Sequence, residues 1–532
     1  MDQLVTYYNS YLIPFTVQAE KVVKKHKAAS ISIAVALAAA YFITEKVIKP
    51  PKALRQLPRP NFINFLRDSL STATLHEIAH KYTLPAAAQN ENGLYARFDA
   101  QGWCAVITSP ALAKKFLLKS DLFAKVDLGK TLQGTISGKF MFGPNIVITQ
   151  GLEWKKHRKI ANPAFNRSMP VQLFARLTNK AFDVMEAEME NGVIDIQEFF
   201  IRWTLDAIGL AGFGFDFKAV EDKNSSWVTT YNAINDALHD IKFAIFPSLD
   251  KEYLWLFPKR QKLHKRLDEF LHMIDDVIEN KRRVLKEQKE SDVEESERDL
   301  LTLMIESELK GEGALTDEEL KSDLCIFFVA GHDTTANALA FTMYYLAANP
   351  HIQKKARKEV IEALGDEPTD IVPTVEQTRS LRYIDCVIKE TLRIASPAIG
   401  LVARYCTEDT ELGGIVFPKG TRFNLDIYGL HHDPRIWDSP DDFRPERFLP
   451  GGEAEQLATS GLGMAWVPFG NGARQCIGMN FSLAEQRTML PLLLRKYEWS
   501  LPPNSPHRER PVTTNMGILS PIDLKLKFEK RY

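Results

Sequence analysis

The longest helical pattern of apolar residues in the chain covers residues 315–349. Thr316 and Glu319 at its start have the spacing of a capping box, in which two side chains satisfy backbone N–H groups at a helix N-terminus. The interior is apolar except for the stretch AGHDTT at residues 330–335. A carboxylate buried in such a segment needs a partner or a function. The pattern therefore predicts a long helix whose polar middle is either a kink in the core or a functional site.

Other segments carry weaker versions of the helical and strand patterns. Residues 481–493 predict an amphipathic helix, and residues 154–158 place Trp154 and Arg158 on one helix face. Residues 242–260 are rich in aromatic side chains but broken by prolines, so they cannot form one regular helix. Strand-like runs occur at residues 93–98, 105–108 and 414–417.

The N-terminal 60 residues differ from the rest of the chain. Residues 28–44 contain no charge, and their length is at the lower end of what spans a bilayer, about 17–25 residues. A signal peptide is the alternative, although its basic region would be unusually long. Lysines precede the segment, and a slight excess of basic residues after it favours a cytosolic body. We expect residues 1–49 to hold a membrane anchor, residues 50–60 to form a proline-rich hinge, and residues 61–532 to form one domain.

Composition narrows the class of protein. The chain has 532 residues, 45% hydrophobic and 25% charged, with a formal net charge of −1. This is ordinary for a globular protein, and it gives no reason to expect a nucleic-acid partner. The five cysteines lie far apart and form no C-x-x-C pair, which argues against a structural zinc site and a disulfide framework. A reducing, cytosol-facing environment is the simplest interpretation.

The segment FGNGARQCIG at residues 469–478 surrounds Cys476 with glycines. Glycine permits positive φ and a close approach of the backbone to a ligand. The helix that follows would favour a thiolate at Cys476. Phe469 could shield the sulfur from water, and Arg474 offers a charged fork for a carboxylate. A lone cysteine is more often a small buried hydrophobe, but a core cysteine needs no glycine-rich cradle.

This segment resembles the Phe-x-x-Gly-x-Arg-x-Cys-x-Gly motif of the cytochrome P-450 (heme-thiolate) superfamily at every defined position. The resemblance implies a single-domain, mainly α fold with a small β-rich lobe. It implies that Cys476 is the axial ligand of the iron in heme b (iron protoporphyrin IX) and that Arg474 pairs with a heme propionate. Phe469, Gly472 and Gly478 would complete the heme-binding loop.

Three further motifs follow the family's order. Trp154 and Arg158 match Trp-x-x-x-Arg, whose side chains contact a propionate, and Arg404 fits a further propionate contact. Glu390 and Arg393 match Glu-x-x-Arg. The resemblance implies that these two residues form a buried ion network with Arg447, which positions the cysteine loop.

The stretch at residues 330–335 resembles the family's oxygen-activation motif, Ala-Gly-x-Asp-Thr-Thr. The resemblance implies that Ala330 and Gly331 leave room for O2. Asp333 would relay protons from solvent, and Thr334 would donate a hydrogen bond during oxygen activation. His332 occupies the variable position, and we assign it no role.

The family also suggests where substrate binds. The apolar segment after Arg393 would line the pocket with Ala398, Ile399, Leu401 and Val402, and the turn at residues 514–519 would reach it with Ile518. Residues 242–260 would form a lid at the bilayer surface. Adjacent histidines at 431 and 432 lack a third ligand and point in different directions, so we reject a metal site there.

The function implied by the resemblance is a monooxygenase that inserts one atom of O2 into a lipophilic substrate, such as a steroid, fatty acid, terpenoid or xenobiotic. Too few residues follow Gly478 for a flavin domain, so electrons would come from NADPH indirectly, through a separate flavoprotein reductase. Lys155, Lys156 and Lys159 are either its docking patch or a solvated face. We expect the protein at the endoplasmic reticulum membrane. A thiolate-heme isomerase or dehydratase and a heme-binding sensor remain alternatives, and the Asp333–Thr334 pair argues against both.

Overall fold

The computed structural model describes residues 44–532 except 100, 167–168, 239, 288–297 and 310–312, together with residues 32, 35 and 41. The expected membrane anchor at residues 28–44 therefore lies almost wholly outside the described residues. Most of the charged tract at residues 286–298 lies outside them too.

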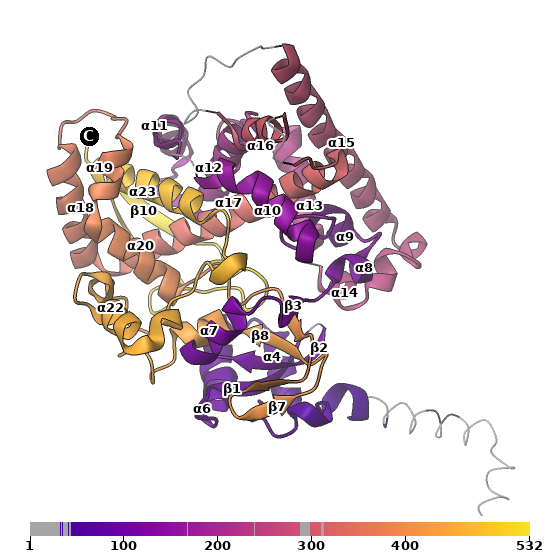
Figure 1. The fold of residues 1–532 in the computed structure, drawn as a ribbon. Helices are drawn as coiled ribbons and strands as arrows, with labels where there is room; N and C mark the ends of the chain where they lie inside the picture. The colour runs from indigo at the N-terminus through magenta and orange to yellow at the C-terminus, as the bar shows by residue number, and fades with distance from the viewer. Residues whose placement is uncertain are drawn as a thin grey trace, which may run out of the picture.

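A body of helices makes up most of the described chain (Figure 1). Its longer helices are α10 (Gly151–Asn166), α11 (Val171–Glu188), α12 (Ile196–Ile208), α13 (Ser226–Leu238), α15 (Pro258–Glu287), α16 (Leu300–Leu309), α17 (Asp317–Ala348), α18 (Pro350–Leu364), α20 (Arg382–Ile394) and α23 (Met479–Lys496). Its shorter helices are α8 (Leu128–Leu132), α9 (Ile136–Met141), α14 (Ile241–Ile245), α19 (Val375–Ser380) and α22 (Glu453–Leu457).

Helix α17 is the long helix predicted from the apolar pattern. Thr316 and Glu319 form the expected capping box at its start. Among the described residues it is the one helix long and apolar enough to cross a membrane, but 83% of its most apolar window is buried inside the protein. It runs through the middle of the helical body, where α12 and α20 pack against it (Figure 1). These facts make α17 the core helix of the fold.

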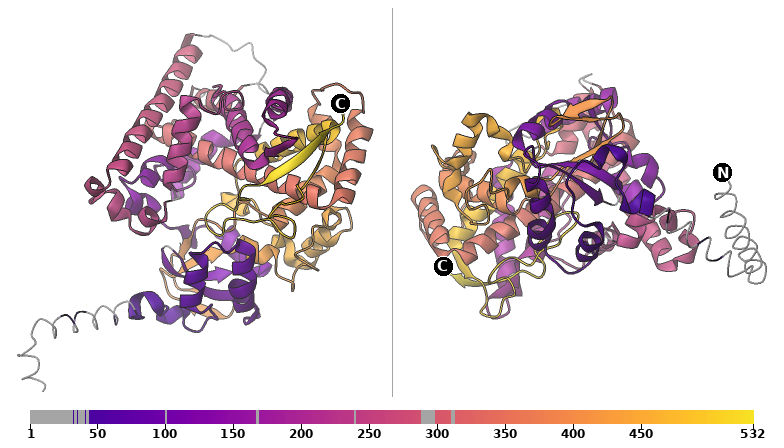
Figure 2. Two further views of the ribbon diagram at one scale, coloured as in Figure 1. Left: turned by 180° about the vertical axis from the view of Figure 1, so that it is seen from behind. Right: turned by 90° about the horizontal axis from the view of Figure 1, so that it is seen from below.

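A smaller lobe at one end of the helical body holds the main sheet (Figure 1, Figure 2). The strand order is β1-β2-β8-β5-β3, with β2 and β8 parallel and the other pairs antiparallel. The five strands are β1 (Leu94–Asp99), β2 (Gly102–Ile107), β3 (Phe123–Lys125), β5 (Arg404–Cys406) and β8 (Arg422–Leu425). The short helices of this part are α4 (Phe62–Ser69), α5 (Leu75–Ile78), α6 (Leu84–Ala88), α7 (Pro110–Leu118) and α21 (Ile427–His431).

Two small sheets complete the strands. One has the order β4-β10-β9, from Val193–Asp195, Lys525–Lys530 and Tyr497–Ser500, and the other is the hairpin of β6 (Thr410–Leu412) and β7 (Ile415–Phe417). The three strand-like runs found in the sequence correspond to β1, β2 and β7. The mainly α fold with a small β-rich lobe is therefore confirmed.

The proline-rich segment at residues 50–60 is packed against the sheet. Leu54 and Leu57 are each 2% exposed and belong to the core of the smaller lobe. The carbonyl of Pro58 accepts a hydrogen bond from the N–H of Ala96 in β1. Much of the segment expected to be a hinge is thus part of the folded body.

Candidate functional site

A cavity of about 360 Å³ lies where the helical body meets the sheet lobe. Most of its walls come from α10, the middle of α17, residues 392–404, the loop at 468–478 and the start of α23, and single residues of α7, β3 and α12 complete them together with residues 146–147. The volume falls in the usual range for a small-molecule site. Three of the four sequence motifs contribute to these walls.

The glycine-rich loop presents Cys476 to this cavity, and α23 begins three residues later. The N–H of Cys476 donates to the carbonyl of Phe469 at 2.9 Å, which closes the loop. Gly472 has φ +71°, and a Cβ there would come within 2.8 Å of the Leu117 carbonyl. Gly472 does not line the cavity within the described residues. Its role in the loop is therefore close packing against α7.

The ionisation of Cys476 differs from the expectation based on the helix N-terminus. Burial raises the pKa of the Cys476 thiol, while the N–H of Gly478 and the charge of Arg158 lower it. The net pKa is raised, because desolvation outweighs the two favourable contacts. The protein alone thus favours the neutral thiol, and a bound metal ion would have to displace its proton.

Four cationic side chains line the same cavity: Lys125, Arg158, Arg404 and Arg474. Burial and the three arginines lower the pKa of Lys125 to about 7. Burial also lowers the pKa of Arg404 and of Arg474 to about 10. The guanidinium carbon of Arg474 lies 4.1 Å from the ring centre of Trp154, a contact that the sequence analysis did not predict. The sequence analysis did not identify Lys125 as a member of this cluster, because no motif surrounds it.

Part of this cationic cluster is unsatisfied. Nη1 of Arg474 and Nε of Arg404 are buried without a hydrogen-bond partner among the described residues. Buried, mutually repelling cations with free donors are expected where an anionic group binds. An apolar cavity with a cysteine on its wall and a cationic edge fits a flat, largely apolar cofactor that carries carboxylates. The residues present therefore fit heme b.

Helix α17 contributes Ala330, Gly331 and Thr334 to the cavity wall. A Cβ at Gly331 would lie 3.1 Å from the Ile208 side chain of α12, so this glycine also permits close helix packing. The Thr334 hydroxyl donates to the carbonyl of Ala330 at 2.8 Å. This is the bond to the carbonyl four residues back that threonine forms in helices, and it leaves the oxygen able to accept a hydrogen bond.

Asp333 does not line the cavity but is buried beside it, with 6% of the residue exposed. Its carboxylate lies 3.1 Å from Nε2 of His332 and accepts a hydrogen bond from the Tyr231 hydroxyl at 3.3 Å. Burial lowers the pKa of His332, but Asp333 and the Phe328 carbonyl more than offset this, so the net pKa is raised. His332, to which we assigned no role, is thus a partner of the buried carboxylate. The rule that a buried carboxylate needs a partner could have identified it.

The expected substrate-pocket residues divide into two groups. Ala398, Leu401 and Val402 line the cavity, whereas Ile399 and Ile518 do not. Ile518 instead pairs with Ala398 in an isolated antiparallel bridge, so the turn at residues 514–519 lies alongside the lining segment.

The ion network predicted for Glu390, Arg393 and Arg447 is present, next to the residues that lead into the cysteine loop. Glu390 accepts hydrogen bonds from Arg393 at 2.8 and 2.9 Å and from Nε of Arg447 at 3.2 Å. The side chains of Glu390 and Arg393 are fully buried. Nη1 of Arg393 also donates to the carbonyl of His431, and Nε2 of His431 accepts from the N–H of Val467. The network is therefore connected to the residues that lead into the cysteine loop.

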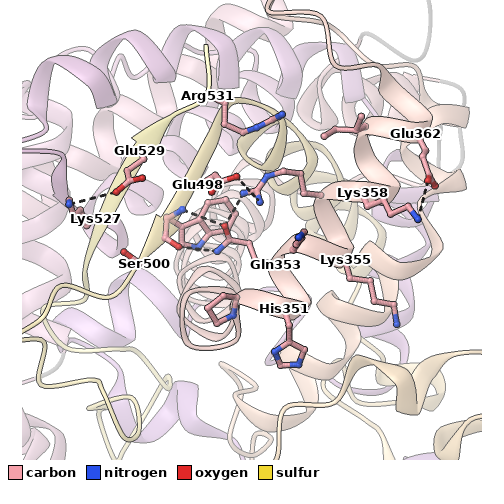
Figure 3. A pocket seen from close by; sticks show the side chains of 15 residues that line it. His351, Gln353, Lys355, Lys358, Glu362, Glu498, Ser500, Lys527, Glu529 and Arg531 are labelled. Carbon is pink, nitrogen blue, oxygen red and sulfur yellow. Dashed lines mark hydrogen bonds and ion pairs between the residues drawn. The ribbon is translucent and has the colours of Figure 1, made fainter.

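A second, open groove lies between α18 and the strands β9 and β10 (Figure 3). Several of its charged residues form ion pairs within one element, such as Lys358 with Glu362 on α18 and Lys527 with Glu529 on β10. It is lined by neither a cysteine nor any residue of the four motifs. The cavity at Cys476 is consequently the better candidate for chemistry.

Comparison with known proteins gives a consistent result. The family model for cytochrome P450 matches residues 98–528. Cytochrome P450 3A9 of Rattus norvegicus is 29% identical over 423 residues, which are 76% of this chain and 78% of the relative. Cytochrome P450 4F8 of Homo sapiens is 28% identical over 499 residues, 90% of this chain and 91% of the relative. Cytochrome P450 3A5 of Homo sapiens is 30% identical over 366 residues, 66% and 69% of the two chains.

Proposed function

The chain belongs to the cytochrome P450 family, and on this premise we propose how its residues carry out the reaction of a heme-thiolate monooxygenase. The observation that carries the proposal is that Cys476, the cationic cluster and Thr334 line one cavity. Heme bound there with a thiolate ligand supplies oxidising power and favours O–O cleavage. The protein supplies the ligand, the anion-binding edge, the substrate pocket and the proton path.

Each group of residues has its own task in this proposal. Cys476 would hold the iron of heme through its sulfur, and this would require the thiol to lose its proton. Arg158, Arg404, Arg474 and Lys125 hold the carboxylates of the cofactor, which relieves the repulsion among these cations. The ion network around Glu390 holds the cysteine loop in place through the residues that precede the loop.

Proton delivery falls to the middle of α17. Thr334 lies on the cavity wall. Asp333 is its neighbour in sequence, and the carboxylate of Asp333 contacts the side chains of His332 and Tyr231. Because the Thr334 hydroxyl already donates to Ala330, its oxygen is able to accept a hydrogen bond from a protonated group in the cavity. Asp333 and His332 hold a proton at the junction between their side chains and supply it toward this position.

The surface of the lid segment supports a membrane-associated enzyme with lipophilic substrates. Between α14 and α15, Phe246, Tyr253, Trp255 and Leu256 each expose half or more of their surface. Aromatic side chains next to lysines fit the interface of a bilayer, from which apolar substrates would enter. We place the enzyme at the endoplasmic reticulum membrane with its body in the cytosol.

Electrons come, in this proposal, from a separate NADPH-dependent flavoprotein reductase. Lys155 and Lys159 on α10 are exposed, whereas Lys156 contacts Glu319 at 2.6 Å. In this proposal the docking patch consists of Lys155 and Lys159, because Lys156 is engaged in an ion pair with Glu319. An acidic surface on the reductase would complement it.

Replacing Thr334 with alanine tests the proton path. The variant should bind heme as the wild type does and still consume NADPH in the presence of reductase. Product formed per NADPH should fall by roughly tenfold or more and hydrogen peroxide should accumulate, because a positioned proton-transfer group contributes at least that much. Thr342→Ala is a matched control, since Thr342 makes the same bond to the carbonyl four back on α17 but is not on the cavity wall. Unchanged coupling in Thr334→Ala would remove this residue from the path.

The substrate class is tested by titrating the oxidised protein with a panel of compounds while recording its heme spectrum. Steroids, fatty acids, terpenoids and lipophilic xenobiotics should shift the spin state, because Ala398, Leu401 and Val402 offer them an apolar wall. Polar analogues of equal size serve as the control. A shift produced only by the polar compounds would reject a lipophilic substrate.

A further inference from the structure

Three metal-ligating side chains meet on the surface of the smaller lobe, away from the cavity. His76 lies in α5, His80 follows in the adjoining π-helical turn Ala79–Thr83, and Asp441 lies in the loop after α21. One ligand atom from each lies within 4.8 Å of the others. Nε2 of His80 is 3.3 Å and Nδ1 of His76 is 3.9 Å from the same Asp441 oxygen.

We propose that His76, His80 and Asp441 form a site for a divalent transition metal ion, with Zn²⁺ as the best match. Zn²⁺ binds histidine nitrogen and carboxylate oxygen at about 2.0–2.2 Å. In tetrahedral coordination that places ligand atoms roughly 3.4 Å apart, close to the two distances observed here. Imidazole donors select zinc-like ions over Mg²⁺ and Ca²⁺. Three protein ligands leave a fourth position for water.

The surroundings keep the histidines available as ligands. The ring centres of His76 and His80 are 4.0 Å apart, so the two imidazoles lie next to each other at the site. The side chain of His80 is 39% exposed and that of Asp441 is 27% exposed, so an ion reaches the site from solvent.

Two other groups facing the site affect the metal affinity. The Arg510 guanidinium lies 3.9 Å from the second oxygen of Asp441 and competes with a cation for this carboxylate. The Tyr428 hydroxyl lies 3.4 Å from Nδ1 of His76 and has to give up this contact when the nitrogen binds a metal ion. Removing the charge of Arg510 should therefore tighten metal binding.

A bound ion would connect the start of the folded chain to the loop that supports the ion network. Asp441 directly precedes Asp442, whose carbonyl accepts a hydrogen bond from Nη2 of Arg393 at 3.3 Å. His76 and His80 belong to the segment that follows α4. A metal ion at this site would hold together two segments that are more than 350 residues apart in sequence.

The test uses the heme-loaded full chain without a histidine tag, stripped with a chelator and titrated with ZnCl2 at pH 7.5 by calorimetry. The wild type should bind one Zn²⁺ that Mg²⁺ does not displace. His80→Ala and Asp441→Asn should each weaken this binding by about tenfold or more, since each removes a metal ligand. Arg510→Gln should strengthen it. His272→Ala is the matched control, because His272 is 83% exposed beside Asp275 on α15 and far from the site in sequence.

Hydrogen exchange supplies the second measurement. Zn²⁺ should slow exchange in residues 74–83 and 437–443 together in the wild type, and in neither segment of His80→Ala. The heme spectrum of His80→Ala should equal that of the wild type, which separates this site from the monooxygenase function. Absence of Zn²⁺ binding by the wild type, or binding that survives both ligand substitutions unchanged, would overturn the proposal.

Discussion

Cys476→His should lose the strongly red-shifted Soret band that we expect of the reduced wild-type protein with carbon monoxide, and it should lose monooxygenase activity. The band reports a thiolate ligand, and Cys476 is the cysteine that lines the cavity. The expected loss of activity is essentially complete, because histidine cannot donate electron density as a thiolate does. The measurement is the difference spectrum of the reduced protein with and without carbon monoxide.

A cysteine outside the cavity provides the control for this experiment. Cys386 is 4% exposed on α20, and burial raises the pKa of its thiol to about 11. Cys386→Ala should keep the red-shifted band, since alanine suits the helix and no ligand is removed. A wild-type spectrum typical of histidine-ligated heme, or a red-shifted band that persists in Cys476→His, would contradict the assignment of Cys476.

The comparison of sequence and structure shows which features local chemistry determines. The capping box at Thr316 and the loop before α23 follow from residues only a few positions apart, and both were predictable. The same holds for Trp154 and Arg158, which one helix turn brings together. These features depend on backbone geometry that a short segment determines by itself.

Other features depend on packing between distant segments, and these were missed or misplaced. Lys125 joins the cationic cluster only because β3 pairs with β5, the strand of Arg404. Ile518 was expected in the pocket but does not line it, and its backbone instead pairs with Ala398, which does. Which side chains point into the cavity depends on how several helices and strands pack together, and the sequence of one element does not determine this.

The ionisation of Cys476 also combines a local contribution with one that depends on the complete fold. Its position before a helix N-terminus favours a thiolate, and this local contribution is visible in the sequence. Burial acts in the opposite direction and is larger, so the net pKa is raised. The extent of desolvation depends on the complete fold, so the segment around Cys476 does not by itself determine the net shift of the pKa.

Glu390→Ala should destabilise the folded protein by about 3–5 kcal/mol, the usual effect of removing one partner from a buried ion pair. Arg393 and Arg447 would remain buried, at 0% and 3% exposure, as two cations without the carboxylate between them. The N–H of Arg444, which donates to Glu390 at 2.9 Å, would also lose its acceptor. The measurement is the urea midpoint of unfolding, together with the fraction of protein that retains heme.

An exposed pair on α18 distinguishes this effect from the general loss of a charge. Glu362 lies 3.8 Å from Lys358, and both side chains are more than 60% exposed. Glu362→Ala should change stability by at most about 0.5 kcal/mol, because solvent already screens this pair. Heme retention should fall only in Glu390→Ala, since the His431 contacts connect this network to Val467 and the cysteine loop. If both variants unfolded at the same urea concentration, the network would contribute no more than a surface pair, and the cysteine loop would have to be held by its glycine turns and by its packing against α7.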